Sequence, residues 1–550
     1  MRDATITLCL LSAVLTARGE FAIDRSVMSE KYWAVWNDEA QARIDADIEK
    51  YRKADAVVEL EAPAGTVVKV EQLSHAFFFG AHIFNFNQLG KTEWNERYKE
   101  LYGTLFNSAT VAFYWRTLER YPYAPRFAEA YEDTEEYWNR EYARDPVGPM
   151  HKAHWRRPAP DPVVGFCKTR GVRIHGHPLV WGNNAWHTPT WLWEDFCPAD
   201  EKFALEQATG VKVPTRDWRL PMGVKDMVRD RNERVWADAW SAIYAKLSEA
   251  EIAALVPSFV KAQNLFYEKR IREIAERYGS RVDSWDVVNE SATDWANGAR
   301  RTWPAGESAA VNALPLTKSH YGVMPANYAY NGLVLARKHM KPDAWLNLNE
   351  YNMSAFPGQI KDLQAHGADF DVVGSQMHLF NPKESASIAR GEFSDEARGK
   401  VTPEGIAKTM AEVAAASGGK PIHLSEITIT APDMTPQGQM VQAIIMRNCY
   451  RAWFAVREMN GITWWNVVDN CGAPGEPSIS GLFTRDMKPK TAYYAMDDLI
   501  NREWKTHLEV KAKGEDEGRK VVAFRGFRGT YRLTWTDAAG ATHTKLVDLK

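Results

Sequence analysis

Two glutamates follow two apolar segments that have the composition of β-strands. Glu290 comes directly after residues 284–289, and Glu426 comes directly after residues 421–425. One carboxyl group can give a proton to a leaving oxygen, and a second carboxylate can attack or stabilise the carbon that becomes positively charged. Cleavage of a glycosidic bond requires this pair of groups. The sequence therefore predicts this chemistry, provided that the fold brings the two glutamates together.

The chain is rich in tryptophan, with 22 in 550 residues. Aromatic ring faces are surfaces on which sugar rings can stack. Most tryptophans in a chain of this size fill the core, so we treat those near the presumed chemistry as candidates only as a group. They are Trp181, Trp186, Trp191, Trp193, Trp464 and Trp465.

The overall composition is that of a globular protein with a large core, since 45% of the residues are hydrophobic and 25% are charged. The formal net charge is only -3, and acidic and basic residues are interspersed. This gives no electrostatic reason to expect a nucleic acid or a membrane as partner. We expect a monomer that acts on a neutral or mildly acidic oligosaccharide or polysaccharide.

The first 17 residues predict a signal peptide, because Arg2 precedes an apolar stretch from Ile6 to Ala17. The stretch is too short to span a bilayer, and we expect a secreted or periplasmic protein. Cys9 would leave with this segment. The other four cysteines lack the paired spacing of a zinc site, so they are either buried thiols or include one disulfide. They are Cys167, Cys197, Cys449 and Cys471.

Between residues 76 and 500, strand-like runs alternate with helical periodicity, which is typical of βα units around a parallel sheet. Eight such runs predict a closed (β/α)8 TIM barrel. In that fold catalytic groups stand at the carboxyl ends of strands, where Glu290 and Glu426 fall, on the fourth and seventh. The expected strands lie near 77–83, 109–113, 173–180, 282–288, 344–348, 371–376, 421–425 and 461–466, and expected helices include 260–278, 328–339 and 437–459.

Two connections exceed the usual length, residues 188–256 after the third strand and 291–325 after the fourth. Long connections on the active face of a barrel usually shape a cleft or a lid. Outside the barrel, residues 35–75 predict a helix that begins after Asn37 and two strands, and residues 501–550 predict further strands. We expect the strands of both termini to pair into a small β-sandwich-like appendage.

The barrel region resembles glycoside hydrolase family 10, the retaining endo-β-1,4-xylanases. The segments that carry the resemblance occur in the family's order on successive strands. They are residues 176–181 (GHPLVW), 285–290 (WDVVNE), 349–352 (NEYN), 374–379 (GSQMHL), 425–426 (SE) and 461–465 (GITWW).

The resemblance implies that Glu290 is the general acid and base and Glu426 the nucleophile, with no metal or other cofactor. Retention of configuration requires these carboxyl groups about 5 to 5.5 Å apart. It also implies that Asn289 holds a sugar hydroxyl and that His378 bonds Glu426. The remaining substrate-binding residues that it implies are His177, Trp181, Tyr351, Gln376 and Trp465.

The chain departs from the family after the second strand, where Ala112 and Phe113 stand in place of the Glu and Asn that grip a neighbouring sugar. Arg116 stands near the place of a family Lys and is a further candidate for substrate binding. Other departures are Gly182, Thr428 and Ala473. Xylan is the first candidate substrate, but the rebuilt periphery suits a related substituted plant or algal polysaccharide, including one with acidic sugars.

Three alternatives stay open at this stage. The barrel could cleave a β-glycoside other than xylan, or it could bind carbohydrate without cleaving it. It could also be a metal-dependent hydrolase, since histidines and one aspartate lie near several strand ends. The candidate metal ligands are His82, His175, His177, His378, His423 and Asp469.

Overall fold

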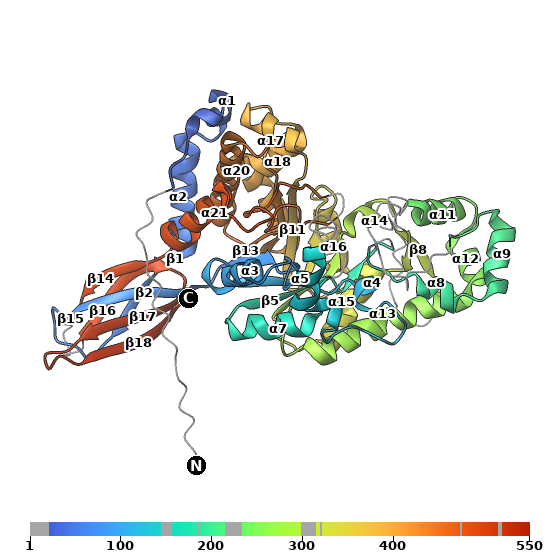
Figure 1. Ribbon diagram of the computed structural model, residues 1–550, viewed down its shortest axis with the longest axis horizontal. Helices are drawn as coiled ribbons and strands as arrows, with labels where there is room; N and C mark the ends of the chain where they lie inside the picture. The colour runs from blue at the N-terminus through green and yellow to red at the C-terminus, as the bar shows by residue number, and fades with distance from the viewer. Residues whose placement is uncertain are drawn as a thin grey trace, which may run out of the picture.

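The computed structural model describes residues 21–144, 157–184, 186–214, 234–298, 315–319, 322–473, 476–514 and 520–550. A central barrel is flanked by a β-sandwich on one side and a mostly helical lobe on the other (Figure 1). The expected signal peptide, residues 1–17, lies outside the described residues. Among the helices in the described ranges, none combines the length and the apolar stretch needed to span a bilayer.

The barrel consists of eight parallel strands, and the last pairs with the first to close it. All eight expected strands are present, and their residues are almost all buried, as expected for strands covered on both faces. The two-residue β6 (Val180–Trp181) continues beside β7. The barrel strands are β3 (Phe78–His82), β4 (Ser108–Ala112), β5 (Arg173–His177), β7 (Ser284–Asn289), β10 (Trp345–Glu350), β11 (Val372–Leu379), β12 (Ile422–Ile429) and β13 (Met459–Trp464).

Helices surround these strands. The expected helices 260–278 and 328–339 correspond to α13 (Pro257–Tyr278) and α15 (Tyr328–His339). The third, α20 (Pro436–Ala455), ends before the expected residue 459, because Val456 is extended and β13 begins at Met459. The other helices of the barrel are α3 (Thr92–Thr104), α4 (Trp115–Leu118), η2 (Tyr131–Asp133), α5 (Glu135–Arg144), α7 (Pro160–Thr169), α16 (Phe356–Ala365), α17 (Pro382–Ala389), α18 (Asp395–Val401), α19 (Pro403–Ser417), α21 (Thr491–Asp498) and η5 (Leu499–Glu503).

Both strands that carry the candidate glutamates contain a register irregularity. Val287 is an extra residue in β7 relative to β10, and Ser425 is an extra residue in β12 relative to β11. Such bulges re-aim the side chains that follow them. Glu426 directly follows one of these bulges. It lies inside β12, which runs on to Ile429, and not at a strand end as expected. Glu290 follows β7 with a φ of 56°, in the left-handed region that a non-glycine residue rarely adopts.

The two long connections pack against each other to form the helical lobe. The first contains α8 (Trp191–Phe196), α9 (Ala199–Thr209), α11 (Arg234–Tyr244) and α12 (Glu249–Leu255). The second contains α14 (Ala292–Ala296) and the hairpin of β8 (Leu316–Ser319) and β9 (Gly322–Pro325). Their apolar residues share a core that is separate from that of the barrel, and it includes Trp193, Trp240, Ile252, Leu316 and Val323. Figure 1 shows this lobe at the end of the molecule opposite the sandwich.

The strands of the two termini form a sandwich, as expected. The N-terminal strands do not pair with each other, because each pairs with C-terminal strands. Apolar residues from both sheets share one core, including Val58, Val70, Phe524 and Leu533. One sheet contains β1 (Lys53–Glu59), β16 (Lys520–Phe527) and β15 (Lys513–Gly514), and the other contains β14 (His507–Lys511), β2 (Val67–His75), β17 (Gly529–Thr536) and β18 (Thr542–Leu549).

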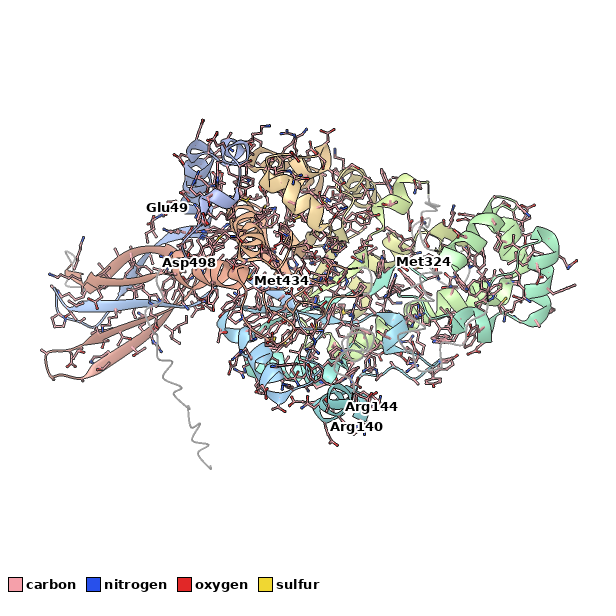
Figure 2. The ribbon with its side chains drawn as sticks, turned by 45° about the horizontal axis from the view of Figure 1, so that its top comes forward. Glu49, Arg140, Arg144, Met324, Met434 and Asp498 are labelled. Carbon is pink, nitrogen blue, oxygen red and sulfur yellow. The ribbon has the colours of Figure 1, made fainter. Side chains whose placement is uncertain are left out.

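The helix α2 (Asp38–Arg52) links the sandwich to the barrel. The Asn37 side chain caps it by accepting a hydrogen bond from the Ala40 amide, as expected from the sequence. Arg525 of β16 donates to Glu49 of α2 over 2.6 Å, and Figure 2 labels Glu49 beside the sandwich. Arg52 donates to the Phe454 carbonyl of α20. The preceding elements are η1 (Arg25–Val27) and α1 (Glu30–Val35).

The cysteines of the described ranges are all free and buried, so the structure favours the thiol alternative over a disulfide. They are Cys167, Cys197, Cys449 and Cys471. Burial raises the pKa of the Cys167 thiol to about 12, which keeps it protonated and unreactive at neutral pH.

Candidate active site

A cavity of about 490 Å³ opens at the carboxyl ends of the barrel strands. Nine of the ten residues that the sequence nominated for the site line it, and Arg116 does not. The nine are His177, Trp181, Asn289, Glu290, Tyr351, Gln376, His378, Glu426 and Trp465. The other lining residues are Tyr114, Thr117, Arg157, Trp186, Phe380, Lys400, Ala473 and Glu476.

The Gln376 side chain connects the two glutamates. Its Nε2 lies 3.2 Å from Oε1 of Glu290 and 2.9 Å from Oε1 of Glu426. The two carboxylate oxygens therefore lie no further apart than the sum of these two distances. Carboxyl groups separated by about 6.5 to 9.5 Å leave room for a water molecule between acid and base, whereas about 5 to 5.5 Å is typical of direct nucleophilic attack. The geometry agrees with the shorter separation.

Glu426 lies among donors that can stabilise its carboxylate. Asn349 donates to its Oε1 over 3.0 Å, in addition to Gln376. His177 Nε2 lies 3.8 Å from the same oxygen, and His378 Nε2 lies 3.5 Å from Oε2. Burial lowers the pKa of His378 to about 4, so its imidazole is neutral at pH 7. The other ring nitrogen of His378 lies 3.0 Å from the Thr428 hydroxyl, so this threonine positions the ring.

Glu290 is held from the opposite side. The indole of Trp181 donates to its Oε2 over 3.0 Å, while its Oε1 faces Gln376. Its main-chain amide donates to the Asn349 carbonyl over 2.8 Å, which fixes the backbone directly after β7. Asn289, the preceding residue, accepts hydrogen bonds from Asn349 and Gln376, so its amide group is fixed beside both glutamates.

Burial dominates the electrostatics of the pair. Together with the nearby carboxylates of Glu426 and Glu350, it raises the pKa of Glu290 to about 8. Burial also raises the pKa of Glu426 to about 8, against the opposing effects of His177 and Asn349. Two buried carboxylates this close do not both ionise readily, so they hold a proton between them at neutral pH. Each carboxylate accepts two side-chain hydrogen bonds, but Gln376 lies closer to Glu426 and the neighbouring His177 lowers the pKa of Glu426, which favours Glu426 as the ionised member.

Glu350 is a third buried carboxyl group next to the site, although it does not line the cavity. It accepts main-chain hydrogen bonds from Tyr351, Asn352 and Ala292. Burial raises its pKa to about 7 in spite of these donors. This residue ties the loop after β10, which carries Tyr351 into the cavity, to the loop after β7.

The histidines that suggested a metal site have other partners. Asp286 lies between His175 and His177, with one oxygen 2.9 Å and 2.8 Å from their ring nitrogens. Burial opposes ionisation of Asp286, but the two imidazoles outweigh it and hold its pKa below the usual range. His423 bonds Thr463, and His82 bonds Asn466. Within the described ranges, no three His, Cys, Asp or Glu side chains are arranged so that they could hold a metal ion.

An aromatic surface forms the part of the cavity next to β3 and β4. Tyr114 contacts the rings of His177 and Trp181, and Phe84 contacts the ring of Trp465. Trp465 itself donates to Glu476 over 3.3 Å. Trp181 and Trp465 were predicted from the sequence, whereas Phe84 and Tyr114 were not. The sequence signal for these two is only their position, two residues after β3 and β4.

The basic residue beside this surface is Arg157 and not Arg116. Arg116 is 5% exposed on α4, where its main-chain amide donates to the His187 carbonyl, and its side chain is not part of the cavity wall. The guanidinium of Arg157 instead lies over the rings of Phe84 and Tyr114, at 4.7 Å and 5.1 Å from their centroids. Arg157, which belongs to the segment before α7, is therefore the arginine that lies against two aromatic rings of this surface.

The departures from the family pattern have structural explanations. Phe113 is fully buried against Trp285 and Tyr278, so it belongs to the core and not to the site. A side chain on Gly182 would meet the hydroxyl of Tyr328 and the carboxylate of Asp294. Neither position therefore presents a side chain that could bind a sugar.

The sequence model of the family described as Glycosyl hydrolase family 10 matches residues 249–499, which include Glu290 and Glu426. The chain is 26% identical over 215 residues to Endo-1,4-beta-xylanase A of Halalkalibacterium halodurans, covering 37% of this chain and 47% of that protein. It is 23% identical over 251 residues to Endo-1,4-beta-xylanase B of Thermotoga neapolitana, covering 43% and 62%. The chain thus matches about half the length of these relatives.

Among solved structures, a GH10 protein from Paenibacillus barcinonensis covers 78% of this chain and 96% of its own, at 18% identity and a TM-score of 0.45. Native xylanase 10B from Thermotoga maritima covers the same shares at 16% identity and a TM-score of 0.44. The match of the family model spans the fourth to the eighth barrel strand and both glutamates. Over residues 249–499 the chain is therefore similar to glycosyl hydrolase family 10.

Proposed function

We propose that this protein is a retaining glycoside hydrolase that cleaves xylan or a related substituted β-1,4-linked polysaccharide by double displacement. The observation that carries the proposal is the shared contact of Gln376 Nε2 with Glu290 and Glu426, which limits the separation of their carboxylate oxygens. A separation this short suits a nucleophile that attacks the sugar directly.

In the first step, Glu290 gives its proton to the glycosidic oxygen while Glu426 attacks the anomeric carbon. The bond to the leaving sugar breaks as the bond to Glu426 forms, and the departing hydroxyl takes the proton. The raised pKa of Glu290 keeps this proton available at neutral pH. The donors around Glu426 hold its attacking carboxylate in place.

In the second step, the ionised Glu290 removes a proton from a water molecule, which attacks the anomeric carbon and displaces Glu426. The product keeps the configuration of the substrate because the carbon is inverted twice. Trp181 bonds the acid, and the ring surface of Tyr114, Trp181 and Trp465 supplies apolar faces for the bound sugar.

Support for xylan as substrate comes from the relatives. Those named above are called endo-1,4-beta-xylanases, and the segments shared with the family include both glutamates. Support for a substituted chain comes from the cavity, whose aromatic part next to β3 and β4 also carries Arg157.

The test uses an aryl β-xyloside with an activated leaving group and one with a poor leaving group. Glu426→Ala should abolish hydrolysis of both, whereas Glu290→Ala should retain slow hydrolysis of the activated substrate only, since that leaving group needs no proton. Proton NMR of the first product should show the β-anomer. Matched thermal melts control for folding.

Wild-type-like turnover by Glu426→Ala would remove the nucleophile assignment, and a first-formed α-anomer would overturn retention. A polysaccharide panel with product sizing then identifies the substrate. If a chelator silenced the wild-type enzyme, metal-dependent hydrolysis would replace the proposal. Binding of xylan without hydrolysis of any substrate would favour a carbohydrate-binding protein.

A further inference from the structure

Arg157 stands apart from the catalytic residues, yet its side chain lines the same cavity. Its guanidinium lies over the faces of Phe84 and Tyr114, an arrangement in which the ring electrons attract the cation and restrict its position. Both rings are buried, so the surface beneath the guanidinium is fixed by the core. The side chain is therefore presented to the cavity from a rigid aromatic support.

The main chain of Arg157 is anchored as well. Arg126 donates to the Arg157 carbonyl over 2.7 Å, and the other end of the Arg126 guanidinium contacts Asp133 over 2.5 Å. Asp133 is 3% exposed and also accepts a hydrogen bond from the Ala130 amide. These contacts hold the start of the segment that leads into α7, so the main chain of Arg157 is fixed by the protein itself.

The aromatic support connects Arg157 to the catalytic centre. Tyr114 contacts His177 and Trp181, and Trp181 bonds Glu290. A sugar ring seated against these rings would therefore bring its own substituents close to Arg157. A guanidinium offers a planar fork of N–H donors that matches a carboxylate with two parallel hydrogen bonds.

The other charged groups of the cavity have different surroundings. Glu476 accepts hydrogen bonds from the Trp465 indole and the Ala473 amide. Lys400 forms an ion pair with Glu396, one turn earlier on α18, at 2.5 Å. Neither group has an aromatic support among the ring contacts of the described residues, so Arg157 is the better candidate for recognising a planar anion.

We propose that Arg157 binds the carboxylate of a uronic acid carried by the substrate, and so directs the enzyme to acid-substituted glycans. This inference rests on the proposed function, because it assumes that the cavity binds a sugar chain. The inference narrows the proposed substrate class from xylan in general to glycans that carry a uronic acid.

The test compares two xylo-oligosaccharides that differ in one group. One carries a glucuronic acid branch, and in the other the same carboxyl group is reduced to the alcohol. The measured quantity is the ratio of kcat/KM for the acidic substrate to kcat/KM for the reduced one. The variants are Arg157→Gln, which removes the charge, Arg157→Lys, which keeps the charge without the fork, and Lys400→Gln as a matched cation control.

The wild-type enzyme should prefer the acidic substrate, and Arg157→Gln should lower the ratio by roughly 10- to 100-fold, as expected for a charge-assisted bidentate pair. The ratio for Arg157→Lys should lie between those of the wild type and Arg157→Gln. Lys400→Gln should keep the wild-type ratio. A wild-type ratio near one would overturn the proposal, and so would an equal fall in the ratio for Lys400→Gln.

A third substrate with a sulfate ester on the same branch separates the two sources of negative charge. Preference for the sulfate over the carboxylate would overturn the uronic acid assignment. Failure of this inference is distinct from failure of the proposed function. In the first case the aryl β-xylosides are still hydrolysed while the ratio is insensitive to Arg157, and in the second case no glycoside is hydrolysed.

Discussion

The cavity has two walls that the chain builds in different ways. The strand wall consists of Asn289, Gln376, His378 and Glu426, which all lie within the barrel strands β7, β11 and β12. The loop wall consists of Tyr114, which lies beyond the end of β4, and Arg157, which lies before α7, and the buried Phe84 packs beneath Arg157. Residues on strands are positioned by the sheet itself, whereas residues on loops are positioned by packing against other side chains. We therefore expect the strand wall to determine the reaction chemistry and the loop wall to determine which substrate is bound.

The largest expected effect is on the strand wall. Gln376→Ala removes the donor that contacts both glutamates, and the loss of one such preorganised group typically lowers kcat by roughly 10²- to 10³-fold. Steady-state kinetics on an activated aryl β-xyloside measures this effect. The thermal melt should change little by comparison. A kcat within about threefold of wild type would show that the shared contact does not matter for catalysis.

On the loop wall, Tyr114→Ala should act mainly on binding. Removal of a ring that contacts His177 and Trp181 should raise KM by roughly tenfold, with a smaller change in kcat. The neighbouring residue supplies the control, because Phe113 points into the core. Phe113→Leu should lower Tm and leave KM unchanged. If Tyr114→Ala lowered kcat as strongly as Gln376→Ala, the distinction between the two walls would fail.

The contrast between the walls also explains what the sequence could predict. The eight barrel strands were predictable because short apolar runs between segments of helical periodicity leave few alternative assignments of secondary structure. With the strands placed, the residues of the strand wall follow, since strand ends meet at one face of the barrel. The bulges at Val287 and Ser425 were not predictable, because they depend on the register of neighbouring strands. Glu426 therefore lies inside a longer strand than expected.

The loop wall was not predictable in the same way. Arg116 was nominated because it stands near the place of a family residue, but α4 turns it into the interior. Arg157 reaches the cavity from a segment far along the chain, and its contacts with Phe84 and Tyr114 exist only in three dimensions. The sandwich is a related case. Its strands were expected at both termini, but the choice of partners depends on a shared core.

The pH dependence offers a third test of the strand wall. Glu290 must hold a proton to act as the acid, and its pKa is raised to about 8. The value of kcat/KM should therefore fall about tenfold per pH unit above this value, as the proton of Glu290 is lost. Tyr114→Phe should leave this basic limb in place, because it keeps the ring and adds no charge. If the basic limb of the kcat/KM profile had its midpoint below pH 6, a group other than Glu290 would control the reaction.

The smallest expected effect concerns the coupling between the two glutamates. The Glu426 carboxylate raises the pKa of Glu290 by disfavouring a second negative charge. Glu426→Gln removes that charge and retains the size of the side chain, so the pKa of Glu290 should fall below its wild-type value. We expect this variant to be inactive, so the titration of Glu290 is followed by carbon NMR of labelled glutamate instead of by kinetics. Glu476→Gln is the control, because this cavity carboxylate is not among the main causes of the raised pKa of Glu290. An unchanged Glu290 pKa in Glu426→Gln would mean that burial and Glu350 set it without Glu426, and the carboxylates of Glu290 and Glu426 would then titrate independently.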